Sequence, residues 1–181
     1  MKNILGIVAF VIACPITVIG TEPPKWAGTW VLNVAESTFG PFLMPGLPPE
    51  LAILSQTLKL EITAKSFELT GESNYRDGSG IHASHEHVSL KLDGEETVFG
   101  RVSLSFKPVD DLAFKITSKL KNSDPYLVEV SYFSVSPDGT KLSETKTQTE
   151  REVVTEGANK TSGAVIRTAT SVLVFAPQPQ K

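Results

Sequence analysis

The stretch Trp26-Ala-Gly-Thr-Trp30-Val-Leu32 decides how the rest of the chain is interpreted. If these residues form a strand, Trp30 and Leu32 share one face, because side chains alternate between the two faces of a strand. Gly28 lies on the same face and leaves room beside the indole. This arrangement suits a first strand that closes one end of a rolled sheet. The same residues are also consistent with an ordinary core tryptophan in any other β-domain.

The sequence after this stretch is a series of alternating segments separated by turn residues. From Gln56 to Ile62, apolar residues occupy every second position, which predicts a half-buried strand. The same pattern recurs along the chain and predicts about nine or ten strands, with no helix of useful length. Residues 143–152 alternate as well, but they are polar throughout and rich in threonine, so we expect an exposed strand there. Glycine, proline and aspartate mark turns at residues 77–80, 93–94, 108–111, 122–125 and 136–139.

Consecutive hairpins along one chain favour an antiparallel meander. Closure of such a sheet removes the exposed edges that an open sheet would have to protect. We therefore predict an all-β, antiparallel up-and-down barrel of about 8–10 strands, with a β-sandwich as the alternative. Residues 21–176 form this single domain, and residues 177–181 form a flexible tail.

The pair Gly28 and Trp30 resembles the Gly-x-Trp signature of lipocalin-type (calycin) barrels. The resemblance implies that Trp30 closes the base of the barrel and that an arginine from a late strand packs over it. Arg167, on the last predicted strand, is matched to that arginine, and Arg151 is the second choice. The wider stretch from Gly28 to Phe39, and the hairpin Val135-Ser-Pro-Asp-Gly-Thr-Lys-Leu142, resemble small exported bacterial domains of uncharacterised function.

Length and charge limit the classes of function. The chain has 181 residues, enough for one domain with a sizeable core, and a net charge of −3. It contains no basic tract, which argues against a nucleic-acid partner.

The first twenty residues differ in character from the rest. Lys2 precedes a long apolar run that ends before polar Thr21, which predicts a secretory signal over residues 1–20 and a secreted or periplasmic protein. A retained membrane anchor is an alternative, because the run is long for a signal core. Cys14, the only cysteine, follows a lipobox-like Val-Ile-Ala and would carry a lipid anchor, although Pro15 argues against this. After signal removal we expect no disulfide and no membrane span.

A proline-rich segment over residues 34–54 interrupts the strand pattern. Its prolines deny the backbone donors that a sheet ladder needs, so we expect an irregular stretch, with one helical turn near its end. The segment also holds several large apolar side chains, which a solvated linker would not contain. We expect it to fold back over the barrel as a lid or plug. Its candidate ligand-binding residues are Phe42, Leu43 and Met44.

All three histidines lie in the stretch His82-Ala-Ser-His85-Glu-His87. His85 and His87 share one strand face, as chelation of zinc or copper requires. The apolar residues that follow mark the other face as inward, so this pair points outward and finds no third ligand on its strand. We therefore assign no metal site and keep His85 and His87 only as candidate ligands.

No catalytic motif stands out from the rest of the sequence. There is no Gly-x-Ser-x-Gly elbow and no glycine-rich phosphate loop before a helix. The neighbouring carboxylates Asp110-Asp111 and Glu95-Glu96 lie in turns, and adjacent strand residues point to opposite faces. We predict that the chain is not an enzyme, has no catalytic residues and needs no cofactor.

Three functional hypotheses follow. The first is an exported binding module that carries a small apolar or lipid-like ligand in the barrel, an expectation that rests on fold analogy. The second is a non-catalytic structural or interaction protein of the cell envelope with a filled core. The third, less favoured, is a metal-dependent enzyme that uses the cluster from His82 to His87. A hollow interior would separate the first hypothesis from the second.

Overall fold

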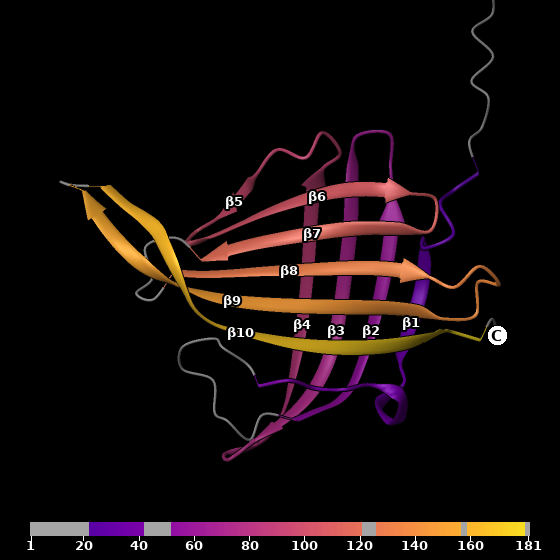
Figure 1. The fold of residues 1–181 in the computed structure, drawn as a ribbon. Helices are drawn as coiled ribbons and strands as arrows, with labels where there is room; N and C mark the ends of the chain where they lie inside the picture. The colour runs from indigo at the N-terminus through magenta and orange to yellow at the C-terminus, as the bar shows by residue number, and fades with distance from the viewer. Residues whose placement is uncertain (1–21, 42–51, 121–125, 157–158, 180–181) are drawn as a thin grey trace, which may run out of the picture.

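A computed structural model describes residues 22–41, 52–120, 126–156 and 159–179, without the side chains of residues 155–161. The described part of the chain is built from strands and one short 3-10 helix (Figure 1). In chain order the elements are β1 (Gly28–Leu32), η1 (Val34–Glu36), β2 (Ala52–Ile62), β3 (Ser66–Asp77), β4 (Gly80–Lys91), β5 (Thr97–Phe99), β6 (Val102–Asp110), β7 (Ala113–Leu120), β8 (Tyr126–Val135), β9 (Leu142–Glu156) and β10 (Asn159–Pro177).

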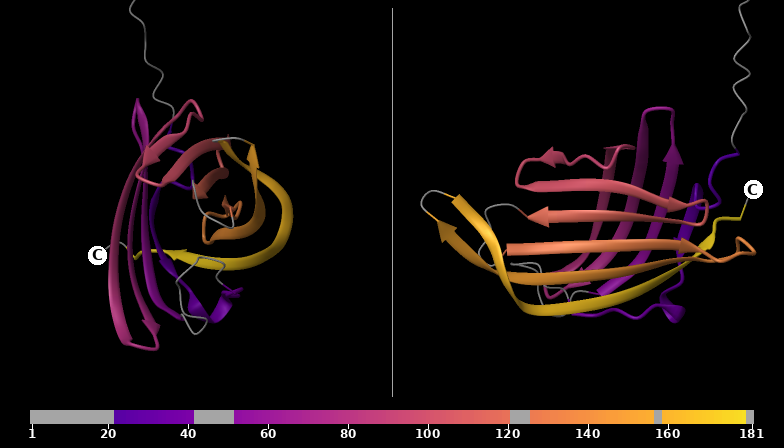
Figure 2. Two further views of the ribbon diagram at one scale, coloured as in Figure 1. Left: turned by 90° about the vertical axis from the view of Figure 1, so that its left-hand side faces the viewer. Right: turned by 45° about the horizontal axis from the view of Figure 1, so that its top comes forward.

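The strands form one antiparallel sheet in the order β4-β3-β2-β1-β10-β9-β8-β7-β6-β5. Every strand except β1 and β10 pairs only with its neighbours in the chain, and β1 lies between β2 and β10. The sheet rolls up so that β4 comes next to β6, and the result is a nearly closed barrel (Figures 1 and 2). The predicted all-β, up-and-down barrel is confirmed, and one rolled sheet takes the place of the two facing sheets of a sandwich.

The alternation read from the sequence places the apolar side chains inside the barrel. Leu58 and Leu60 of β2, Phe67 and Leu69 of β3, and Leu90 of β4 are all buried. Tight turns connect these strands, and the turn before β9 depends on Gly139. Its φ of +73° lies in the left-handed region that favours glycine, and its N–H donates to the carbonyl of Ser136 at 2.8 Å.

One end of the interior is filled by packed aromatic rings, which we call the aromatic end: Trp26, Phe67, Phe106, Phe114 and Phe133. Phe67 stacks on Phe106 with ring centroids 4.2 Å apart, and Phe114 stacks on Phe133 at 4.5 Å. Trp26 packs against Phe114 with a centroid distance of 4.8 Å. Fully buried rings of this kind contribute the largest share of core stability per residue.

The described part of the predicted lid continues the ladder of β1 along β10. Thr38 forms an antiparallel bridge with Val172, and Gly40 lies so close to β10 that a Cβ there would fall 2.2 Å from the carbonyl oxygen of Thr170. The predicted irregular segment over residues 34–54 is too long, because residues 52–54 already belong to β2 and form no helical turn. Ala52 and Ile53 pair with Arg76 and Tyr75 of β3.

Candidate ligand-binding cavity

The inner face of β9 is polar, in contrast to the rest of the barrel interior. Glu144, Gln148 and Glu150 are buried, and Lys146 lies between them on the same face. We call these four residues the polar wall. The predicted exposed strand over residues 143–152 is therefore wrong: one of its two polar faces points into the barrel.

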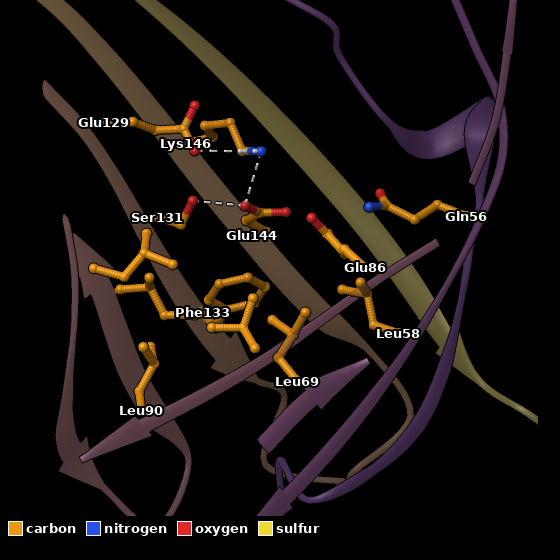
Figure 3. Close-up of a pocket in the computed structure, with 13 residues that line it drawn as sticks. Gln56, Leu58, Leu69, Glu86, Leu90, Glu129, Ser131, Phe133, Glu144 and Lys146 are labelled. Atoms are coloured by element: carbon orange, nitrogen blue, oxygen red, sulfur yellow. Dashed lines mark hydrogen bonds and ion pairs between the residues drawn. The ribbon is translucent and has the colours of Figure 1, made fainter. Parts of the chain in front are cut away.

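Ser131 and Glu129 of β8 are the partners of Glu144, Lys146 and Gln148, and Figure 3 shows the interactions of Glu144 and Lys146. Ser131 Oγ donates to Glu144 Oε1 at 2.7 Å, and Gln148 Nε2 donates to Glu129 Oε2 at 2.7 Å. Lys146 Nζ lies 3.5 Å from Glu144 Oε1 and 3.7 Å from Glu129 Oε1. A single ammonium group thus bridges two carboxylates, and buried charges persist only when they are paired in this way.

The surrounding carboxylates fix the charge state of Lys146. Its pKa is raised well above the usual value, chiefly by attraction to Glu144 and then to Glu129 and Glu86, while burial acts in the opposite direction. Lys146 therefore stays protonated at any physiological pH.

A cavity of about 160 Å³ lies between the aromatic end and the polar wall. Its apolar side is formed by Leu58, Leu69, Val88, Leu90, Leu104, Ile116 and Phe133. Its polar side is formed by Gln56, Glu86, Glu129, Ser131, Glu144 and Lys146. Three carboxylates and one ammonium give the lining a net charge of −2 when all are ionised.

Two polar groups of the cavity lack partners among the described residues. Gln56 Oε1 is buried and accepts no hydrogen bond. The carboxylate of Glu86 interacts only at longer range, through attraction to Lys146. Gly71 of β3 is the direct cross-strand partner of Glu86 on β4. A Cβ on Gly71 would come 2.7 Å from Glu86 Oε1. The missing side chain of Gly71 therefore makes room for this carboxylate.

The residues singled out by the resemblance have separate places in the structure. Trp30 is buried, and its indole N–H donates to the carbonyl of Trp26 at 2.9 Å; a Cβ on Gly28 would lie 3.8 Å from Trp30 Nε1. Arg167 does not pack over Trp30, because β10 passes Trp30 at Pro177, near its far end. The guanidinium of Arg167 instead forms two hydrogen bonds with the carboxylate of Glu150.

The second-choice arginine and the candidate ligand-binding residues are the remaining predictions. Arg151, the second choice, donates to the carbonyl of Gly163 at 3.3 Å. Phe42, Leu43 and Met44 lie outside the described residues, as do residues 1–20 and Cys14.

The histidines of β4 lie beside single carboxylates. His85 Nδ1 is 3.7 Å from Glu72 Oε1, and His87 Nε2 is 3.4 Å from Glu68 Oε2; both imidazoles are largely exposed. His82 Nε2 lies 3.0 Å from Asp77 Oδ1. In the described ranges, no group of three or more histidine, cysteine, aspartate or glutamate residues could hold a metal ion.

Sequence reasoning missed the polar side of the cavity, although a signal was present. Residues 143–152 are polar on both faces of the predicted strand. In a closed barrel, however, one face of each strand must point inward. A strand that is polar on both faces therefore indicates either an edge outside the barrel or a polar interior. The partners Glu129 and Ser131 show the same feature on an otherwise apolar β8 face.

The described residues contain no helix long and apolar enough to cross a membrane. No protein-family model matches the chain, and no curated protein matches it. The cavity is therefore the basis for assigning a function.

Proposed function

We propose that this chain is a binding module that holds one small molecule inside its barrel. The observation that carries the proposal is a cavity with one apolar side and one charged side, on which Gln56 Oε1 is buried without a partner. Buried polar groups are almost always hydrogen-bonded, and an exception at a cavity calls for an explanation. A bound molecule that donates to this oxygen supplies one. Export of the module, expected from the N-terminal sequence, belongs to the same proposal.

The size of the cavity limits the ligand. A cavity of roughly 150 Å³ holds a molecule such as benzene, so about 160 Å³ suits six to eight non-hydrogen atoms. A fatty acid with sixteen carbons would need on the order of 400 Å³ by the same scaling. The cavity therefore favours a compact molecule over the long-chain lipid that the barrel analogy implies.

The two sides of the cavity define the polarity of the ligand. Leucine, valine, isoleucine and phenylalanine side chains offer an apolar surface, against which a ring or short alkyl group loses contact with water. The facing carboxylates and amide offer directional contacts that orient the ligand. An amphipathic small molecule uses both.

Ligand-observed NMR with a library of small aromatic and aliphatic fragments tests the proposal on the full chain. We expect saturation transfer from the protein to some fragments, and its loss in a Leu104→Trp variant, because the indole fills the cavity. Filling a packed interior costs about 1–3 kcal/mol, so circular dichroism should confirm that the variant folds. Val109→Trp is the matched control, since Val109 is exposed on the same strand. Equal transfer in the two variants would mean that the fragments bind outside the cavity, and this would contradict the proposal. No transfer in the wild type would support a barrel with a filled core and would contradict it as well.

A further inference from the structure

We infer that the cavity selects a small organic cation, namely an amine whose ammonium group lies between Glu86, Glu144 and Gln56. This inference rests on the proposed function of the barrel as a binding module. It names the chemical class of the ligand and the residues that distinguish that class from neutral or anionic molecules of the same size.

The charge of the lining is the first argument. Lys146 lies within 4 Å of Glu144 and Glu129, whereas Glu86 has no cation at that distance among the described residues. The lining keeps a net charge of −2 when all four groups are ionised, and the part of this charge at buried Glu144 is screened less than it would be in water. A cation entering the cavity lowers the electrostatic energy of the site, and an anion raises it.

The direction of the polar groups is the second argument. Figure 3 shows the carboxylates of Glu86 and Glu144 and the amide of Gln56 pointing into the same part of the cavity. A carboxylate accepts hydrogen bonds only, and Gln56 Oε1 is an unused acceptor. The site thus presents acceptors from three strands, β2, β4 and β9, and its donors, the amide N–H groups of Gln56 and the ammonium of Lys146, are fewer than the lone pairs of these acceptors. An ammonium group brings three donors and no acceptor, which is the complement of this set.

Two of the donors in the cavity, Ser131 and Lys146, already have partners on its polar side. Ser131 Oγ already donates to Glu144, and the ammonium of Lys146 lies between Glu144 and Glu129. Gly71 holds open the place that Glu86 occupies, so the carboxylate faces the cavity from the opposite side of the barrel to Lys146. The ligand's ammonium would fill the gap between these two sides.

The test compares three molecules with one aromatic ring and similar size: benzylamine, benzyl alcohol and benzoate. Isothermal titration calorimetry at pH 7 with the full chain measures each affinity. We expect benzylamine to bind at least about tenfold more tightly than benzyl alcohol, and benzoate to show no binding. Raising the salt concentration should weaken benzylamine binding more than benzyl alcohol binding.

Two variants locate the ammonium group. Glu86→Gln keeps the shape and removes the charge, so the preference for benzylamine should fall to about threefold or less. Because Glu86 is exposed to solvent, this variant should fold like the wild type. Glu72→Gln is the matched control, since Glu72 is an exposed glutamate on the outer face of β3, and it should leave the preference unchanged.

The outcomes separate the two proposals. If the alcohol and the amine bind with equal affinity, the inference about the cation is overturned while the binding module stands. If none of the three molecules and no fragment of the NMR library binds, both proposals fail. If the preference survives Glu86→Gln or disappears in Glu72→Gln, the assigned position of the ammonium is wrong.

Discussion

The aromatic end and the polar wall both lie on the inward face of the sheet, but they are stabilised by different interactions. At the aromatic end, rings from β3, β6, β7 and β8 stack around Trp26 and exclude water. At the polar wall, one lysine and the carboxylates near it form a network with β8. The boundary between the two regions crosses individual strands. On β8, for example, Phe133 belongs to the aromatic end, and Ser131 and Glu129 contact the polar wall. Inward-facing residues recur at every second position of a strand. Consecutive inward residues of one strand can therefore belong to the packed core and to the candidate site.

The largest effect is expected at the aromatic end. Phe114→Ala should lower the free energy of unfolding by about 3–5 kcal/mol, because it removes a fully buried ring and leaves a cavity. Urea denaturation followed by tryptophan fluorescence measures the change. The matched control is Phe99→Ala on β5, where the ring is 44% exposed and the cost should stay below about 1 kcal/mol. Equal costs for the two variants would show that the aromatic end is not the stable part of the barrel.

A smaller effect is expected at the polar wall. Lys146→Met removes the cation from Glu144 and Glu129 and should cost about 1–3 kcal/mol, less than a fully buried pair because the Lys146 side chain keeps 25% of its exposure. The double variant Lys146→Met/Glu144→Gln should recover at least half of this loss, since the glutamine carries no charge and still accepts from Ser131. The double-mutant cycle uses urea denaturation. Additive losses in the two single variants would mean that the network is not coupled.

The smallest effect concerns acid, and we expect it at Glu150 of the polar wall. The hydrogen bond from Arg167 holds the pKa of Glu150 below its ordinary value of 4.5. The folded-state pKa is thus lower than the unfolded one, so the pair stabilises the fold above about pH 4.5 and loses this contribution as the pH falls further. Arg167→Gln should therefore lower the melting temperature at pH 7 and make little difference near pH 3. The cost at pH 7 should be below about 1 kcal/mol, because the Arg167 side chain is 59% exposed. A difference that is the same at every pH would contradict the role of Glu150.

The fold could be predicted from the sequence because apolar alternation determines which face of a strand is buried. Leu58 and Leu60, or Phe67 and Leu69, carry this information within their own segments. The candidate site could not be predicted in the same way. The polar alternation of β9 is typical of a solvent-exposed strand, and only the paired strand β8 shows that Glu144 has a buried partner in Ser131. Trp26 was missed for a similar reason: it precedes the first strand, and its contacts come from distant rings.

The position of β1 between β2 and β10 has a consequence for synthesis of the protein. The sheet is joined at this point by residues from opposite ends of the chain, such as Leu32 and Phe175. A nascent chain on the ribosome can pair β1 to β4 early, but the other edge of β1 has no partner until the C-terminal strand β10 has emerged. Contacts this far apart in sequence make folding slow and leave strand edges open in the meantime. The topology thus leaves one edge of β1 open until synthesis of the chain is nearly complete.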